Sequence, residues 1–190
     1  MSQVLIIIDL IEDIIGEQGL SNSSAAETKT RDIINKSNKT AQYARAHQIP
    51  VIWVKVGFSD DYHDIPAGSP MFKNAQKLGA LKLSGSGCQW VKGLDVQPQD
   101  HIFIKKGVSA FTSNKLDQWL KQHNCQHLVI GGVSSLMAIQ STARLAHDLG
   151  YQVTVLEDLC AAANEELHRQ SMQALQGMAT ISCSTEWQQS

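Results

Sequence analysis

Short, mainly apolar runs without regular polar alternation recur along the chain. They cover residues 4–8, 51–56, 101–104, 128–130, 152–156 and 179–182. Runs of this kind are typical of strands that are buried on both faces, as in a parallel sheet. The pattern therefore predicts six strands.

The segments between these runs carry apolar residues at every third or fourth position, which indicates helices that pack by one face. These helical segments are residues 28–47, a short patch at 71–78, a helix that begins near Thr112 or Ser113, residues 136–149, and a helix capped by Asn164. Strand and helix thus alternate, which predicts an α/β fold, a doubly wound three-layer sandwich with a six-stranded, mostly parallel sheet. The length of 190 residues suits a single domain over residues 1–190.

The stretch 128–143 contains the sharpest change of pattern in the chain. Its apolar run stops at Gly131 and Gly132, and helical periodicity starts after them. We expect a tight turn at the two glycines, because glycine allows positive φ or a close approach of the backbone, and a helix cap at Ser134 or Ser135. The start of that helix would direct N–H groups and a positive dipole end toward the edge of the sheet. Such a position suits an anion or an oxyanion.

Residues 57–100 form the longest connection between predicted strands. They hold three of the four prolines and six of the 13 glycines. Connections of this length are commonly active-site lids, binding loops or partner surfaces. No pattern within the segment identifies the substrate.

The balance of charge narrows the possible partners. The formal net charge is −2, and the basic residues are scattered rather than clustered. This gives no electrostatic footprint for nucleic acid or acidic lipid. The chain shows neither a long apolar segment nor a signal peptide, so we expect no membrane span and a cytoplasmic location.

Metal and cofactor motifs are weak in this sequence. The four cysteines lie far apart, without a C-x-x-C pair, and are expected to be free thiols of a reducing compartment. Asp61 and His63 have the spacing of half a metal motif, but no second histidine follows at ligand spacing, so we interpret them as a solvated loop. We therefore expect no metal and no other cofactor.

Chemically active side chains follow several of the predicted strands. Asp9 comes directly after the first strand, Lys105 after the third, and the turn at 131–138 after the fourth. In doubly wound sheets the carboxyl ends of parallel strands form one edge, where ligands bind. A carboxylate, an ammonium group and a helix start can together move a proton and hold negative charge. The alternative is structural, with Asp9 as a helix cap and the lysine as its salt-bridge partner.

Several segments together resemble the isochorismatase-like (cysteine) hydrolases, a family of nicotinamidases, carbamoylsarcosine and ureidoacrylate-type amidohydrolases, and isochorismatases. The resemblance spans nearly the whole chain and rests on the order and separation of the segments rather than on any one of them. They are Leu5-Ile-Ile-Ile-Asp9-Leu-Ile-Glu-Asp13, Lys105-Lys-Gly-Val-Ser-Ala-Phe111, Gly132-Val-Ser-Ser-Leu-Met-Ala-Ile-Gln-Ser-Thr-Ala143, Gly150-Tyr and Glu157-Asp158.

The resemblance implies a catalytic triad of Asp, Lys and Cys. Asp9 matches the aspartate that shuttles a proton, and Lys105 matches the lysine, with Lys106 as the alternative. The family often holds the peptide bond between the positions of Val133 and Ser134 in the cis form, which would turn the Ser134 N–H into the oxyanion site.

The sequence departs from the family pattern at the nucleophile. The cysteine of Gly-Val-x-Thr-x-x-Cys lies six residues after its glycine, and six residues after Gly132 is Ala138. We therefore expect Asp9 and Lys105 as catalytic residues with Ala138 at the nucleophile position. Val133, Ser134 and Ser135 are the expected substrate-binding residues.

Three interpretations of this departure remain open. The chain can be a cysteine-independent hydrolase, similar to true isochorismatases, in which an aspartate protonates an enol ether that water then cleaves. It can be an amidohydrolase whose cysteine was replaced, with Ser134 or Ser135 as the new nucleophile. It can also be a non-catalytic binding protein on the same fold. All three imply a small-molecule ligand.

The apolar residues of the long connection also predict self-association. Met71, Phe72 and Trp90 are expected to be exposed and to need cover, and members of the resembled family are often oligomeric. We therefore expect a homo-oligomer, most simply a symmetric one.

Overall fold

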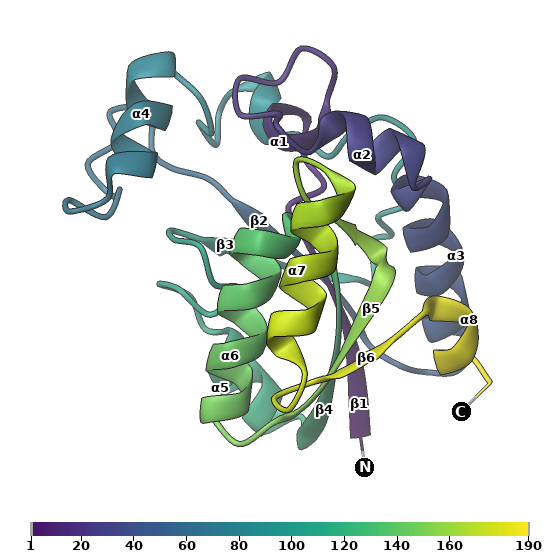
Figure 1. Ribbon diagram of the computed structural model, residues 1–190. Helices are drawn as coiled ribbons and strands as arrows, with labels where there is room; N and C mark the ends of the chain where they lie inside the picture. Colours follow the sequence, from purple (N-terminus) through teal and green to yellow (C-terminus); the bar gives the residue numbers. More distant parts are fainter. Residues whose placement is uncertain (1, 190) are drawn as a thin grey trace.

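Six parallel strands form one sheet at the centre of the molecule (Figure 1). The computed structural model describes residues 2–189. The strand order is β3-β2-β1-β4-β5-β6, and the described strand pairs are all parallel. The strands are β1 (Ser2–Ile8), β2 (Val51–Val56), β3 (His101–Lys105), β4 (Cys125–Val133), β5 (Gln152–Ala161) and β6 (Thr180–Ser182). The predicted doubly wound α/β fold is confirmed.

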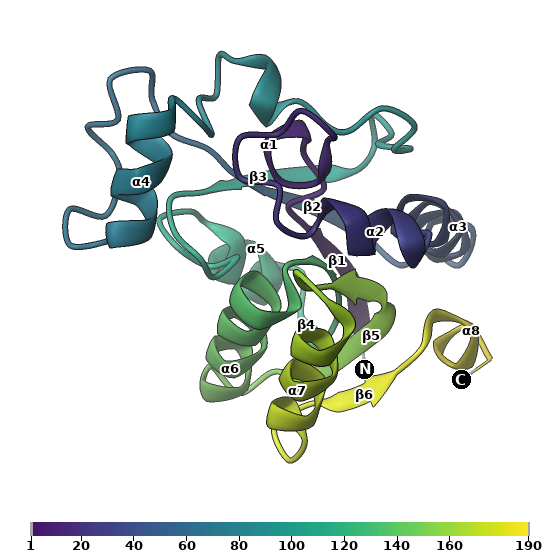
Figure 2. The same cartoon turned by 45° about the horizontal axis from the view of Figure 1, so that its top comes forward.

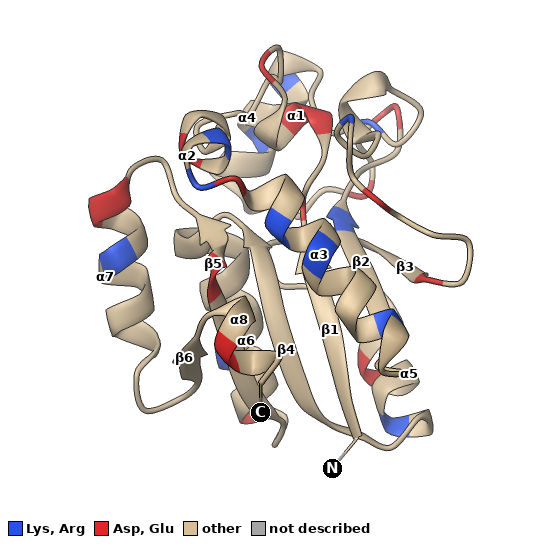
Figure 3. Ribbon diagram, turned by 90° about the vertical axis from the view of Figure 1, so that its right-hand side faces the viewer, with Lys and Arg blue, Asp and Glu red and all other residues tan. Residues whose placement is uncertain are grey.

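Helices cover both faces of this sheet and complete three layers. One face carries α3 (Ile33–Ala46) and α8 (Ser184–Trp187), which lie toward the viewer in Figure 3. The other face carries α5 (Leu116–Gln122), α6 (Gln140–Asp148) and α7 (Glu165–Leu175). Side chains of β1 alternate between the two faces, because Leu5 packs in the core under α3 and Ile6 in the core under α5 and α6.

Short helices lie above the carboxyl ends of the strands (Figures 1 and 2). They are α1 (Glu12–Ile15), α2 (Ala25–Thr30), α4 (Pro70–Leu78) and the single 3₁₀ turn η1 (Ser86–Cys88). The predicted patch at 71–78 is thus a helix, with Pro70 in its first turn and Ser69 as a cap that accepts a hydrogen bond from the Phe72 N–H.

The predicted helix over 28–47 is divided in two. Asp32, between α2 and α3, has φ 55°, which is left-handed and cannot continue a helix. The predicted helix near Thr112 also starts later, since α5 begins at Leu116. The Asn164 cap is confirmed by a 2.9 Å hydrogen bond from the Leu167 N–H to the side-chain oxygen of Asn164.

The turn predicted at the two glycines is wrong, because β4 continues through them to Val133. A Cβ atom on Gly131 would lie 2.8 Å from Cβ of Leu159, and one on Gly132 would lie 2.2 Å from the Ile8 carbonyl oxygen. The glycines therefore allow neighbouring strands to approach closely rather than to reverse direction.

The helix after β4 also starts differently from the prediction. One π-helical turn, η2 (Ser135–Ile139), leads into α6, and neither Ser134 nor Ser135 caps it through a side chain. Strand β5 likewise extends beyond its predicted end at residue 156, so Glu157 and Asp158 lie inside a strand.

None of the described helices, over residues 2–189, is both long and apolar enough to span a membrane.

Candidate active site

Asp9 follows β1 directly and carries a buried carboxylate. Its Oδ2 lies 2.8 Å from Nζ of Lys105, and its Oδ1 accepts a 2.7 Å hydrogen bond from the Val56 N–H at the end of β2. The backbone of Asp9 has φ 60°, so the chain turns sharply as it leaves the strand. The ends of three strands thereby fix one carboxylate above the sheet.

Lys105 is the last residue of β3 and is only 1% exposed. Besides the ion pair, its ammonium group donates a 2.5 Å hydrogen bond to the Val108 carbonyl oxygen. Lys106 instead bonds the Gly57 carbonyl oxygen and the Asp64 carboxylate, each at 2.7 Å. Successive residues of an extended chain point in opposite directions, which separates the two lysines. The structure thus pairs Asp9 with Lys105 and not with the alternative, Lys106.

Burial controls the protonation of Asp9. Removal from water raises the pKa of the Asp9 carboxyl group, and this effect outweighs the opposing charge and hydrogen bond of Lys105. The carboxyl group therefore keeps its proton at a higher pH than an exposed aspartate does. Such a group can act as a general acid.

The turn after β4 forms another wall of the site. The peptide bond between Val133 and Ser134 is cis, as the family resemblance implies. Val133, Ser134, Met137 and Ala138 line the same cavity as Asp9 and Lys105. Position 138 thus presents a methyl group to the cavity.

Ser135, predicted to bind substrate, does not line this cavity. Its side chain is fully buried, and its Oγ lies 2.7 Å from Nδ1 of His168 on α7. The Ser135 carbonyl oxygen accepts a 2.7 Å hydrogen bond from the Ser171 hydroxyl. Because the π-helical turn directs Ser135 toward α7, its hydroxyl group supports the turn from behind.

His168, which contacts Ser135, is itself held by two charged residues. His168 Nε2 lies 3.0 Å from a Glu157 carboxylate oxygen, and Arg31 pairs with the same carboxylate at 3.1 Å. Burial lowers the pKa of His168, so its ring is neutral at neutral pH. No spacing signal in the sequence points to His168, since a single buried histidine on a helix resembles any core position.

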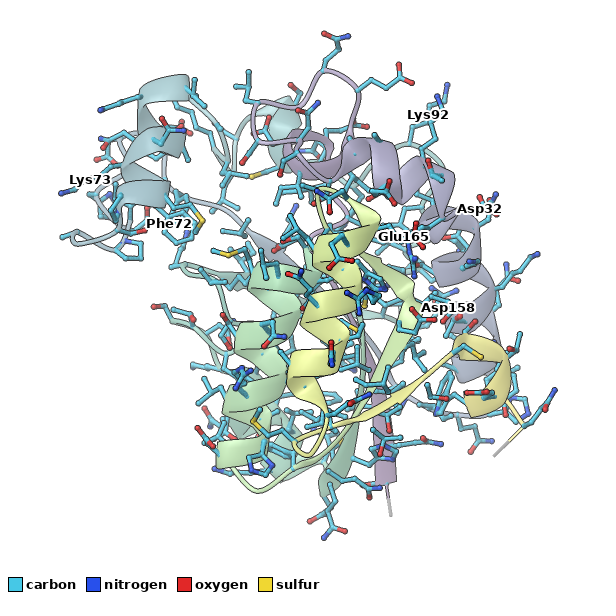
Figure 4. All side chains as sticks on the ribbon, viewed as in Figure 1. Asp32, Phe72, Lys73, Lys92, Asp158 and Glu165 are labelled. Atoms are coloured by element: carbon cyan, nitrogen blue, oxygen red, sulfur yellow. The ribbon has the colours of Figure 1, made fainter. Side chains whose placement is uncertain are left out.

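The cavity has a volume of about 490 Å³ and opens between α4, the loop before α2 and the turn after β4. The predicted role of the 57–100 connection as a binding segment agrees with this, because α4 contributes a whole wall. Phe72 is buried on the inner side of α4, whereas Lys73 points outward (Figure 4). The Ser21–Ser24 wall was missed, because serines before a helix are also typical of an ordinary cap. The lining residues from these segments are Leu20, Ser21, Asn22, Ser23, Ser24, Met71, Phe72, Asn74, Ala75 and Leu78.

Two other predictions concerned the long connection. Asp61 and His63 bond each other at 2.7 Å and are both 72% exposed, and within residues 2–189 no group of three or more His, Cys, Asp or Glu side chains is placed to hold a metal. Of the apolar residues expected to be exposed, Phe72 is buried and Trp90 half-buried, since both pack on cores, and Met71 alone is exposed.

Comparisons with known proteins place these features in a family. A sequence model of the isochorismatase domain matches residues 3–186. The chain is 30% identical over 173 residues to the uncharacterized isochorismatase family protein YecD of Escherichia coli O157:H7, covering 88% of this chain and 84% of that protein. It is 28% identical over 182 residues to the ureidoacrylate amidohydrolase RutB of Klebsiella pneumoniae, covering 88% and 76%.

The fold has close counterparts among solved structures. The crystal structure of an isochorismatase family protein from Desulfovibrio vulgaris superposes with a TM-score of 0.87 at 20% sequence identity, covering 99% of this chain and 97% of that one. At this identity the likeness concerns the fold, and the activity of this chain has to be argued from its own cavity.

Proposed function

This chain belongs to the isochorismatase family of hydrolases, and we propose from that premise that it hydrolyses a small molecule by acid–base chemistry, without a cysteine nucleophile. One observation carries the proposal. A buried carboxylic acid with a raised pKa is paired with a lysine in a cavity that Ala138, the residue we align with the nucleophile position, also lines.

Hydrolysis of an enol ether suits these groups. Asp9 would protonate the carbon atom of the double bond, which leaves a positive charge shared by the neighbouring carbon and the ether oxygen. Lys105 stabilises the carboxylate that Asp9 becomes. Water then adds to the cationic carbon and returns a proton to Asp9. The resulting hemiketal breaks its carbon–oxygen bond to give a carbonyl compound and an alcohol, so the whole reaction consumes one water molecule.

The second candidate is amide hydrolysis, which the similarity to ureidoacrylate amidohydrolase favours. Ala138 offers no covalent nucleophile, so such a reaction would need another group. Of the two serines considered, Ser134 lines the cavity and Ser135 does not. Ser134 is therefore the residue to test for this alternative.

Several wider properties belong to the same proposal. Residues 1–190 act as one domain, without a metal or other cofactor, on a small-molecule substrate and not on nucleic acid or a membrane. The four cysteines are all free, which supports a reducing, cytoplasmic location. A homo-oligomer is also part of the proposal.

Activity assays on three substrate classes test the proposal. The purified protein is incubated with vinyl ethers, both isochorismate-like and uncharged, with nicotinamide and with ureido compounds, beside the Asp9→Asn and Ser134→Ala variants. Cleavage of a vinyl ether that is lost in Asp9→Asn and kept in Ser134→Ala supports acid–base hydrolysis. Amide cleavage that is lost in Ser134→Ala supports the second candidate. Cleavage of none of them favours a binding protein on this fold.

A further inference from the structure

The two charged side chains that line the cavity are bonded to each other. Within residues 2–189, Asp9 and Lys105 are the only charged side chains of its lining. Their 2.8 Å ion pair has no net charge when both are ionised, and the lysine ammonium group also bonds the Val108 carbonyl oxygen. When Asp9 instead holds its proton, Lys105 is the one cation of the described lining, and it is 1% exposed with its ammonium group bonded to Asp9 and Val108.

Cationic side chains near the cavity are directed elsewhere. Lys106 is bonded to Asp64 and to the Gly57 carbonyl oxygen. On α4, Lys73 and Lys77 are absent from the lining, to which the helix contributes its apolar residues and Asn74, and Figure 4 shows Lys73 pointing away from the molecule. The wall that α4 forms is thus free of charge, although α4 carries lysines on its outer side.

The remaining lining is either apolar or uncharged polar. Apolar side chains come from α1, from α4 and the residues after it, and from the loop after β3, as Ile14, Phe72, Leu78, Leu81 and Val108. Hydroxyl and amide groups come from the segment 21–24 and from Asn74. An apolar body would fit the first surface, while a neutral polar group could hydrogen-bond the second.

We propose that the substrate of this cavity is an uncharged small molecule with an apolar body. That the molecule is hydrolysed rests on the proposed function, whereas its lack of charge is inferred from the cavity lining alone. A carboxylate on the substrate would lose its water, while the cation of the described lining, Lys105, is buried and already bonded to Asp9 and Val108, which makes burial of the carboxylate costly. Dicarboxylic vinyl ethers are accordingly excluded as good substrates.

The test compares two ligands that differ in one charge. Binding of phenyl vinyl ether and of 4-vinyloxybenzoate to the wild-type protein is measured by isothermal titration calorimetry, and their hydrolysis is followed in parallel. We expect the neutral ether to bind at least about tenfold more tightly than the carboxylate. Equal or tighter binding of the carboxylate, or binding of neither compound, would overturn the inference.

A charge introduced at the rim should reverse the preference. Leu78 lines the cavity and is half-exposed, so Leu78→Arg can place a guanidinium group at the mouth without burying it. We expect its carboxylate affinity, relative to the neutral ether, to rise about tenfold. Leu149→Arg is the matched control, because Leu149 is also exposed but lies outside the cavity lining. An unchanged ratio in Leu78→Arg, or the same rise in Leu149→Arg, would contradict the proposal.

The two proposals fail in different ways. If the neutral ether binds but neither compound is hydrolysed, the acid–base function is wrong and the neutral cavity stands. If 4-vinyloxybenzoate is hydrolysed with the higher kcat/KM, the acid–base function stands and the inference about charge is wrong.

Discussion

The pairing of Asp9 with Lys105 determines both the chemistry and the pH dependence of stability at this site. In Lys105→Met the Asp9 carboxyl group would stay buried without its cation, and its pKa, already raised by burial, would rise further. A group with a raised folded-state pKa binds more protons when folded. Its contribution to stability is therefore present at low pH and is lost as the pH rises above the unfolded value of about 3.9.

We predict that Lys105→Met loses stability more steeply with rising pH than the wild type does, with a deficit of about 3 kcal/mol at pH 8. Urea unfolding at pH 5 and pH 8 measures this. The double variant Asp9→Asn/Lys105→Met removes the buried charge altogether and should restore most of the loss. A deficit of equal size at both pH values would show that lost packing, and not the carboxylate, is responsible.

In the proposed alignment, Ala138 occupies the position of the nucleophile cysteine. It lines the cavity at the start of the helix after β4. A thiol at this position would have a helix start and the Lys105 cation nearby, both of which lower a cysteine pKa, while an ionised Asp9 would oppose them.

We predict that the Ala138→Cys thiol reacts with iodoacetamide much faster than the native cysteines, three of which are buried. Burial raises the pKa of Cys88 to about 11, so this thiol stays unreactive. Ala143→Cys is the control, because Ala143 is buried on α6 outside the cavity lining. Mass spectrometry of labelled peptides gives the rates. Equally slow labelling at positions 138 and 143 would contradict the alignment of this turn with the nucleophile turn.

Strands β1 and β4 approach each other so closely that one position tolerates no side chain. Gly132 has φ +120°, and its Cβ would overlap the Ile8 backbone, whereas Gly177 has φ +91° with open space around it. We predict that Gly132→Ala lowers the free energy of unfolding by more than about 3 kcal/mol, and that Gly177→Ala costs about 1 kcal/mol. Urea denaturation of both variants tests this. Similar losses would mean that φ strain alone governs both sites.

The sequence predicted the regular elements well because each strand is a mainly apolar run and each long helix has a periodic apolar face. The prediction from sequence failed where a residue type was selected by contacts with distant parts of the chain rather than by the local backbone. The turn expected at Gly131 and Gly132 is absent, whereas the close approach also expected there occurs, against Leu159 and Ile8. The single-turn elements α1, η1 and α8 are too short to show any period.

The candidate site was predictable to the extent that parallel topology brings strand ends together. Asp9 directly follows β1 and Lys105 ends β3, so a parallel sheet brings both residues to one edge. The position of the Ser135 side chain could not be predicted in this way, because its direction depends on the π-helical turn. The cavity walls from α4 and from residues 20–24 lie in irregular segments whose path no periodic pattern describes.

At the scale of the whole molecule, exposed apolar side chains gather around the cavity mouth. Leu20, Met71, Leu78 and Met137 all line the cavity and are exposed in the monomer. Apolar groups concentrated in this way favour contact with another surface. We predict a homo-oligomer in solution, most simply a dimer. Light scattering at micromolar concentration checks this, and a monomer mass would contradict it.

The most direct test of the central claim is the rate at which wild-type protein and Asp9→Asn hydrolyse phenyl vinyl ether. Asparagine has nearly the shape of the aspartic acid but cannot donate its proton in the same way. Acid–base catalysis by Asp9 predicts that kcat falls by about 10²- to 10⁴-fold in the variant. Circular dichroism of the variant verifies that it is folded. Hydrolysis at the wild-type rate in Asp9→Asn, or no hydrolysis by the wild type, would contradict the account.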